Sequence, residues 1–312
     1  CLISFTKDAT VRIAPVDLRI RESLEKCPMN PNEKRLGQYL TSQGIQLENA
    51  TVRTVAKEVF LAPSSVVRFV QKLGFEGFND FKKQYLEEIR YLSTHFQKID
   101  SNRPFSQNDK NIVIANKVGL LYDETLQDTI SLLNHDTLQE AINRIEKKEH
   151  IAIVVSGAQK GIAYTFKEKM MKIGKKVNIF DSTDEAFYEA CYCSSNTLFI
   201  LISYSGETSK CLFICHKLIE RKLSFITITT YGTNSLSSQS DCCLYVSTRE
   251  KLIDNLGTFS FNLSLLYLLD VLYAGYFNTS YDEHLENKTV TSMECENIFT
   301  DHGRKTDNPI IK

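Results

Sequence analysis

The sequence predicts a two-domain protein, with an all-α domain followed by an α/β domain built around a five-stranded parallel sheet. The chain has 312 residues, enough for two domains of about 100–200 residues each. Residues 15–93 show only helical spacing of apolar positions, whereas strand-like runs alternate with helical patterns after residue 111. Between them, residues 94–110 lose this periodicity and gather Ser, Asn, Asp and Pro, which indicates a linker.

The first domain is expected to hold four helices. The stretch NPNE at 30–33 has the pattern of a helix start, with an Asn cap, Pro in the first turn and a Glu that closes a capping box. A shorter helix is predicted at about 51–59, and a third from Pro63 to Gly74. A fourth helix should span about 78–92.

The second domain is placed at 111–280. Five apolar runs rich in β-branched residues predict its strands, at 151–155, 177–180, 197–203, 224–229 and 242–246. Helical patterns fill most of the gaps, and strands that are apolar on both faces indicate a parallel sheet covered on both sides. Residues 281–312 hold 4 Lys/Arg against 7 Asp/Glu, and we expect this polar acidic tail to be poorly ordered.

The composition is that of an ordinary globular protein. The net charge of −1 indicates neither nucleic acid nor membrane by itself. The nine cysteines include the adjacent pair Cys242 and Cys243, and no secretory signal is recognisable, which favours reduced thiols in the cytoplasm over a disulfide framework. Cys191 and Cys193 lack a second pair at zinc-site spacing, so we expect no metal and no cofactor. The sequence begins at Cys1 without Met, which leaves the true N-terminus open.

The most apolar segment is 259–277, which is nearly long enough to span a bilayer. Asn262 and Asp270 interrupt it, and no cluster of basic residues flanks it. The sequence therefore favours a buried helix of a soluble domain, and no membrane partner is expected.

Residues 52–73 combine a short helix, a tight turn near 60–62 and a second helix. This arrangement is a helix-turn-helix, whose second helix can enter the major groove of DNA. Its polar side offers residue types suited to base edges and phosphates, namely Ser64, Ser65, Arg68, Gln71 and Lys72. A small helical bundle with a solvated polar face has the same pattern, and residues 15–93 carry only 12 Lys/Arg against 10 Asp/Glu.

The segment from residue 50 to 83 resembles the DNA-binding segment of the RpiR/MurR family of bacterial transcription regulators. The family pattern stands intact as VVRF at 66–69, KLGF at 72–75, GF at 77–78 and FK at 81–82. The resemblance implies a double-stranded DNA operator as partner. Phe60 and Ala62 depart from the family, which usually has Gly and then Ser in the turn. Because Gly suits a left-handed position and a Ser cap contributes about 1 kcal/mol, we expect a distorted turn.

The third predicted strand runs into the polar loop SYSGET at 203–208, which precedes a helix. Loop N–H groups and a helix N-terminus form an anion site. Ser203, Ser205 and Thr208 add hydroxyl donors, and Gly206 lets the backbone approach a ligand closely. These neutral donors suit a phosphate monoester on a small molecule. A plain strand-turn-helix connection with capping hydroxyls would have the same sequence.

Residues 111–280 resemble the SIS (sugar isomerase) domain, a flavodoxin-like unit that binds phosphosugars and follows the helix-turn-helix in the RpiR family. SYSGET matches the family's phosphate loop without a change, which implies a phosphosugar effector. Gln159 and Lys160 stand where the family commonly has two small hydroxyl residues. Either this loop has drifted or the ligand differs, with Lys160 facing a carboxylate, a second phosphate or solvent. Glu185 either faces the sugar hydroxyls or begins a solvated helix.

Sensing is favoured over catalysis. SIS isomerases need a general base and usually a His that opens the sugar ring. None of the six histidines falls in a recognisable isomerase motif, and the helix predicted at 256–277 offers no Glu. We therefore expect a transcriptional regulator of sugar metabolism without catalytic residues. A phosphosugar isomerase is the alternative, and an interaction module that has lost ligand binding is a third possibility.

A single recognition helix covers only a few base pairs, so useful specificity requires two copies on a two-fold operator. We therefore expect a homodimer or a tetramer. The apolar helix at 256–277 carries more apolar surface than one side of a sheet should need, and we expect it to contribute to a two-fold interface.

Overall fold

The computed structural model describes residues 29–95, 99–247 and 249–299. The chain divides into two compact units that meet in the sequence between Gln97 and Lys98, with the short piece Tyr231–Thr233 assigned to the first unit. The first unit is all-α and the second is α/β with a five-stranded parallel sheet, so the predicted fold class is confirmed.

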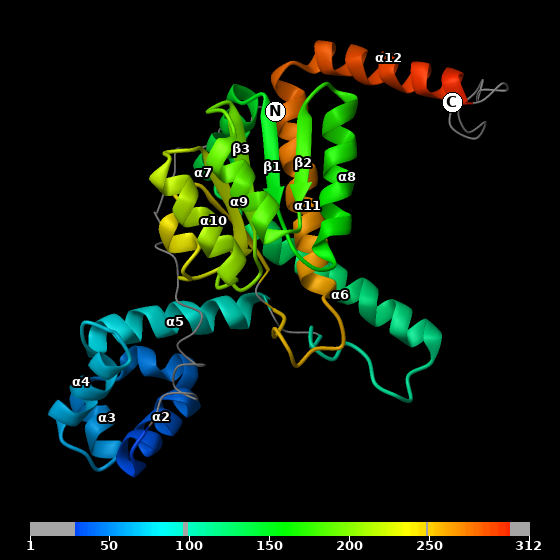
Figure 1. The fold of residues 1–312 in the computed structure, drawn as a ribbon. Helices are drawn as coiled ribbons and strands as arrows, with labels where there is room; N and C mark the ends of the chain where they lie inside the picture. Colours follow the sequence, from blue (N-terminus) through cyan, green and yellow to red (C-terminus); the bar gives the residue numbers. More distant parts are fainter. Residues whose placement is uncertain (1–28, 96–98, 248, 300–312) are drawn as a thin grey trace, which may run out of the picture. The chain divides into compact units, whose positions relative to one another are not determined.

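From residue 29 to residue 95, the first unit contains the four predicted helices (Figure 1) and one additional 3₁₀ helix. In chain order these are α2 (Pro31–Gln43), η1 (Gly44–Asn49), α3 (Val52–Glu58), α4 (Pro63–Lys72) and α5 (Phe78–His95). The capping box of α2 is confirmed, because Asn30 Oδ1 accepts the N–H of Glu33 at 2.9 Å and Glu33 Oε2 accepts the N–H of Asn30 at 3.0 Å. The helix α5 continues to residue 95, beyond its predicted end and into the predicted linker.

The run at 66–83, which carried the family resemblance, builds the core of this unit. Phe81 is fully buried. Its ring stacks on that of Tyr85, with the ring centroids 5.5 Å apart, and meets the ring of Phe75 edge-to-face, with the centroids 5.2 Å apart. Gly74 ends α4 with a φ of +99°, a conformation that favours glycine. The amine of Lys82 donates to the carbonyl of Glu48 in η1 and to that of Ala50 just after it, both at 3.1 Å. Most of the sequence pattern that carried the family resemblance therefore specifies packing, and the polar side of α4 is left for function.

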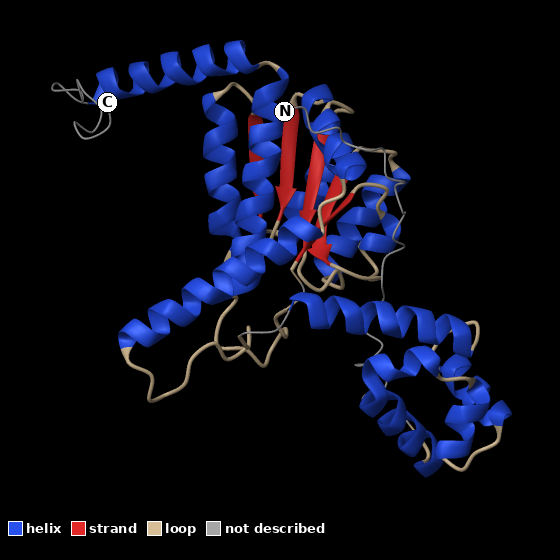
Figure 2. Ribbon diagram, turned by 180° about the vertical axis from the view of Figure 1, so that it is seen from behind, coloured by secondary structure: helices blue, strands red, loops and turns tan. Residues whose placement is uncertain are grey.

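The second unit is organised around one sheet of parallel strands (Figure 2). The strands are β1 (His150–Val154), β2 (Lys176–Phe180), β3 (Thr197–Ile202), β4 (Phe225–Thr230) and β5 (Cys243–Val246). Their spatial order is β2-β1-β3-β4-β5, with all four pairings parallel. This is the doubly wound order of flavodoxin-like folds, in which the chain changes direction between β1 and β3.

Helices cover both faces of the sheet. One face packs on α7 (His135–Lys147), α8 (Gln159–Lys172) and α11 (Phe259–Thr279). The opposite face packs on α9 (Thr183–Tyr192) and α10 (Ser209–Glu220). The strand β1 shows the alternation, because Ile151 and Ile153 join the first cluster while Ala152 and Val154 join the second.

Three further helices lie in the described part of this unit. The helix α6 (Asn111–Ser131) packs on α11, and the buried hydroxyl pairs Thr125–Ser260 and Thr129–Ser264 join them at 3.0 and 2.8 Å. The short 3₁₀ helix η2 (Ser237–Gln239) precedes β5, and α12 (Tyr281–Phe299) follows α11.

The apolar helix α11 begins at Phe259, three residues after its predicted start, and its burial confirms the prediction of a buried helix. Its core side chains are Phe261, Leu265, Leu268, Leu269, Leu272 and Tyr276. The elements α6, α7, α8 and β5 all pack against it, yet Leu266 stays 37 % exposed. A two-fold interface along α11 therefore stays a prediction. None of the described helices is long and apolar enough to cross a membrane.

Two boundary expectations need correction. Residues 281–299 form α12 instead of a poorly ordered tail, and one reason is that His284 is buried, with its ring 4.7 Å from that of Tyr276. Residues 300–312 of the predicted tail lie outside the described part of the chain. Residues 99–110 of the predicted linker belong to the second unit, where several of them bond to the loop after β5. Residues 96–98 are also outside the described ranges.

Candidate functional site

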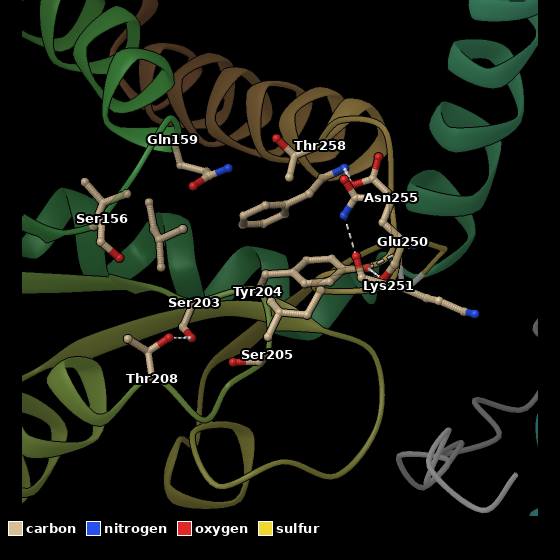
Figure 3. A pocket seen from close by; sticks show the side chains of 14 residues that line it. Ser156, Gln159, Ser203, Tyr204, Ser205, Thr208, Glu250, Lys251, Asn255 and Thr258 are labelled. Carbon is tan, nitrogen blue, oxygen red and sulfur yellow. Dashed lines mark hydrogen bonds between the residues drawn. The ribbon is translucent and has the colours of Figure 1, made fainter. Parts of the chain in front are cut away.

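A cavity of about 180 Å³ lies at the carboxyl ends of β1 and β3. In open parallel sheets this end, at the point where the strand order reverses, is the usual place for a ligand. Three chain segments form the wall: the turn from β1 into α8, the loop after β3 and the loop after β5. Figure 3 shows Tyr204 and the loop after β3 on one side of this space, and Gln159 and Thr258 on the other.

The loop after β3 has a fixed backbone that requires glycine. Gly206 has a φ of +65°, and a Cβ added there would lie 1.9 Å from Oδ1 of Asn234. Asn234 is itself held, because its Nδ2 donates to the side chain of Thr229 and to the carbonyl of Thr230, both at 3.3 Å. The loop therefore passes too close to this amide for any side chain at 206.

The same loop presents its hydroxyl groups toward the cavity. The Oγ of Ser203 and the Oγ1 of Thr208 lie 2.8 Å apart, and both residues line the wall with Ser205. Thr208 is the N-cap residue of α10 but makes no side-chain capping bond. The first-turn N–H groups of α10 therefore lack that partner and, with the positive helix end, can bind an anion.

Glu207 anchors the loop. Its carboxylate accepts both the N–H and the hydroxyl of Ser235, at 2.9 and 2.7 Å. The carbonyl of Gly206 also accepts the N–H of Leu236 at 3.0 Å. These bonds tie the loop after β3 to the segment after β4 and hold its backbone in place.

Tyr204 joins this loop to the loop after β5. Its hydroxyl donates to the carbonyl oxygen of Glu250 at 2.5 Å and accepts the N–H of the same residue at 3.0 Å. Its ring lies 4.8 Å from that of Phe261, which also lines the cavity. Burial raises the pKa of the Tyr204 phenol well above its ordinary value, so the group stays protonated.

Glu250 places a buried carboxylate at the cavity wall. The carboxylate accepts the N–H of Ser260 at 2.6 Å and that of Phe261 at 3.1 Å, and so caps the N-terminus of α11. Burial raises the pKa of Glu250, and these backbone hydrogen bonds oppose the rise.

The three residues predicted for the sugar side separate in space. Gln159 lines the cavity from the first turn of α8, where its amide donates to Oδ1 of Asn262 at 2.9 Å. Lys160 is not among the lining residues, because its amine forms an ion pair with Asp181, which also raises the pKa of Lys160. Glu185 is exposed in the first turn of α9 and does not line the cavity either.

Some lining residues did not follow from the sequence patterns, and they include Ser156, Tyr204, Glu250, Asn255 and Thr258. Tyr204 lies inside the SYSGET motif, where its aromatic ring gave no sign of a polar role. The others could have been found from one general rule. The carboxyl ends of neighbouring parallel strands meet at one edge, so the polar segment after β5 belongs with the loop after β3.

The polar side of α4 is a candidate DNA-binding surface, and all five predicted residues on it are exposed. Lys72 forms an ion pair with Glu33 of α2 at 2.9 Å, and this hydrogen bond lowers the pKa of Glu33. Gln71 Nε2 donates to the carbonyl of Glu76 at 3.4 Å. Within the described residues, the side chain of Arg68 makes neither an ion pair nor a hydrogen bond, so its guanidinium is available to a partner.

The turn before α4 is distorted in the way predicted. Phe60 adopts a φ of +55° and its side chain is 86 % exposed. Ala62 is the N-cap of α4 and provides no side-chain hydrogen bond. The turn therefore carries backbone strain at a position that favours glycine and lacks one stabilising cap.

Comparison with known proteins identifies both units. Residues 16–91 match the helix-turn-helix domain of the rpiR family, and residues 144–274 match the SIS domain. The chain is 27 % identical over 283 residues to an uncharacterized HTH-type transcriptional regulator of Clostridium perfringens, covering 89 % of this chain and 99 % of that protein. It is 23 % identical over 265 residues to the uncharacterized HTH-type transcriptional regulator YbbH of Bacillus subtilis, covering 82 % and 89 %.

Solved structures share the fold. The NanR protein of Vibrio vulnificus, solved in complex with ManNAc-6P, matches with a TM-score of 0.59 and 22 % identity, covering 91 % of this chain and 99 % of NanR. The sugar isomerase domain of an RpiR transcription factor from Sphaerobacter thermophilus matches with a TM-score of 0.52 and 14 % identity, covering 57 % and 98 %. A putative sugar-phosphate isomerase of Listeria monocytogenes matches with a TM-score of 0.51 and 14 % identity, covering 59 % and 98 %.

Proposed function

The chain belongs to the RpiR family, with a helix-turn-helix domain followed by a SIS domain, and we propose that it is a transcriptional regulator of sugar metabolism controlled by a phosphosugar. In this proposal the first unit binds a double-stranded DNA operator in the cytoplasm. A sugar phosphate binds in the cavity at the carboxyl ends of β1 and β3 and changes the affinity for DNA.

One observation carries the ligand proposal: the backbone of the loop after β3 is fixed, and its hydroxyl residues line the cavity. Gly206 permits a backbone that no other residue fits, and Ser203, Ser205 and Thr208 line the cavity beside the N-terminus of α10. A phosphate dianion there would accept hydrogen bonds from these hydroxyls and from first-turn N–H groups. The remaining wall, with Gln159 and Asn255, offers amides suited to sugar hydroxyls.

The DNA proposal is supported by the exposed side of α4. Arg68, with Ser64 and Ser65, would reach base edges or phosphates. We propose that Lys72 contacts a phosphate less strongly, since it already pairs with Glu33. Because one such helix reads few base pairs, we also propose that the protein acts as a homodimer or tetramer.

A second candidate function has one specific observation in its favour. An isomerase of phosphosugars requires a general base near the sugar carbons, and Glu250 is a buried carboxylate with a raised pKa in the cavity wall. However, its carboxylate already accepts two backbone N–H groups of α11. The function as a regulator is therefore the better-supported proposal.

The two functions are separated by experiments on the full chain. Gel-shift titrations with an operator selected from random DNA, repeated with pentose, hexose and amino-sugar phosphates, should show an operator affinity that changes with one of them. In parallel, each sugar phosphate is incubated with the protein and assayed for aldose–ketose conversion. Turnover that disappears in Glu250→Gln, without any DNA binding, would instead support the isomerase.

A further inference from the structure

The loop after β5 takes part in two structural features at once. Residues 249–256 supply Glu250, Lys251, Leu252 and Asn255 to the cavity wall. The same residues bond to the segment 99–103, which is distant in sequence but lies within the same unit. One loop therefore contacts both the ligand cavity and the first described residues that follow α5.

The contacts between these two segments are numerous and partly buried. The hydroxyl of Ser101, a buried residue, donates to the carbonyl of Arg249 at 2.6 Å. Asn102 bonds at three points. Its Oδ1 accepts the N–H of Lys251 at 2.6 Å, its carbonyl accepts the N–H of Leu256 at 2.9 Å, and its Nδ2 donates to the carbonyl of Arg249 at 3.4 Å. An ion pair between Arg103 and Asp254 adds a contact at the surface.

Arg249 fixes the centre of this arrangement. Its guanidinium donates to the carbonyl of Ile99 at 3.1 Å and pairs with Glu124 of α6. The Arg249 side chain is completely buried. A buried ion pair of this kind is costly to break, so Arg249 holds the 99–103 segment against a rigid helix.

The 249–256 loop is also held in place on the side that faces the cavity. Tyr204, in the loop proposed to bind phosphate, bonds to both backbone groups of Glu250. Glu250 is followed directly by Lys251, whose N–H is bonded to Asn102. The carbonyl of Glu250 and the N–H of Lys251 belong to one peptide group. This group is therefore hydrogen-bonded to Tyr204 on one side and to Asn102 on the other.

We propose that residues 249–256 and 99–103 form a clasp that transmits occupancy of the cavity to the chain that leads to the DNA-binding unit. The proposal rests on the proposed function and adds the route of its regulation. The 99–103 segment follows α5 after three residues, so its position fixes where that chain enters the second unit. A ligand that favours one conformation of the 249–256 loop then favours one conformation of 99–103, by at most the same free energy.

The coupling can be measured without any sugar or DNA, by hydrogen–deuterium exchange of the full chain. Tyr204→Phe removes both bonds to Glu250 at the cavity side and touches none of residues 99–103. We expect backbone exchange in 99–103 to rise about two- to tenfold, the factor that corresponds to a lost hydrogen bond. Tyr188→Phe, at an exposed tyrosine of α9, is the matched control and should change nothing in either segment.

The reverse variant keeps the test decisive if Tyr204→Phe folds poorly. Asn102→Ala removes the bonds of this side chain to the Lys251 N–H and to the Arg249 carbonyl, on either side of Glu250. Exchange should then rise at the Ser260 N–H, which is bonded to the Glu250 carboxylate. Exchange that rises only next to each substitution would overturn the clasp. No sugar is used in this experiment. If the protein binds a sugar phosphate but a substitution in one segment leaves exchange in the other unchanged, only this inference is refuted. If exchange in the two segments is coupled but no sugar phosphate binds, only the proposed function is refuted.

Discussion

The phenol oxygen of Tyr204 is bonded to both backbone groups of Glu250, donating to the carbonyl at 2.5 Å and accepting the N–H at 3.0 Å. Tyr204 belongs to the loop after β3 and Glu250 to the loop after β5, so a single hydroxyl joins the two polar walls of the cavity. The cavity is thereby assembled before a ligand binds, which is the condition for tight and specific recognition of a small molecule.

Tyr204→Phe should lower the free energy of unfolding by about 1–3 kcal/mol, because two partly buried backbone groups of Glu250 lose their partner. Urea unfolding at equal protein concentration measures the change, with Tyr188→Phe on the surface of α9 as control. Equal stability of the two variants would show that the bond contributes nothing to the fold.

Gly206→Ala should damage the loop after β3. The φ of +65° costs an alanine about 1–3 kcal/mol, and its Cβ would also collide with the fixed amide of Asn234. The control is Gly119→Ala, in the middle of α6 with open space around it, which should raise stability by about 0.5–1 kcal/mol. A thermal melt in which both variants shift in the same direction would contradict this account of the loop.

Phe60→Gly should stabilise the helix-turn-helix by about 1–2 kcal/mol, since a left-handed residue with a Cβ carries a strain of that size. Phe60→Ala separates strain from the ring, because it keeps the Cβ and removes the exposed aromatic group. We expect no comparable gain from Phe60→Ala in chemical denaturation. Similar gains in both variants would mean that the exposed ring, and not the backbone, is the source of the cost.

The stability of the SIS unit should depend on the ionisation of Glu250. Burial raises its pKa in the folded state above about 4.3, the ordinary value for an unfolded chain, so the folded state binds this proton more tightly. The resulting stabilisation is fully present below about pH 4.3 and is lost as the pH rises through the folded-state pKa. Unfolding free energies of wild type and Glu250→Gln, compared from about pH 4 upward, should show this loss only in the wild type. A difference that is independent of pH would refute it.

On the DNA side, Arg68→Ala should weaken operator binding by about 1–3 kcal/mol if the guanidinium reads a base. Lys72→Ala should have a smaller effect because Lys72 is already paired with Glu33, and Glu33→Gln should strengthen binding by releasing it. Fluorescence anisotropy at two salt concentrations measures these changes. Lys172→Ala on α8 of the SIS domain is the control for general loss of positive charge. The assignment fails if Arg68→Ala and Lys172→Ala behave alike.

Local patterns were sufficient to predict most of the fold. Helix starts such as Asn30 and strands that are apolar on both faces are decided by neighbours in sequence, and the SYSGET loop is one contiguous motif. The partners of Gln159 and Lys160 could not be predicted in this way. Asn262 and Asp181 reach them only through tertiary packing, which draws one side chain into the wall and the other away from it.

The same limit explains the errors. The predicted start of α11 is residue 256, whereas the helix begins at Phe259. The acidic residues after 280 form a helix, anchored in part by the buried His284. The segment 99–103 was predicted to be part of a linker, because its bonds to 249–256 join two chain regions about 150 residues apart.

The central claim is tested most directly by isothermal titration calorimetry of the full chain with sugar phosphates and their unphosphorylated sugars. The panel should span pentose, hexose and amino-sugar phosphates and include ManNAc-6P. The account predicts that at least one sugar phosphate binds and that its unphosphorylated sugar binds at least about a hundredfold more weakly, because two charge-assisted hydrogen bonds of about 1.5–3 kcal/mol each are lost. Ser205→Ala should weaken only the phosphorylated compound. A sugar that binds equally well with and without its phosphate, or a panel in which nothing binds, would contradict the claim.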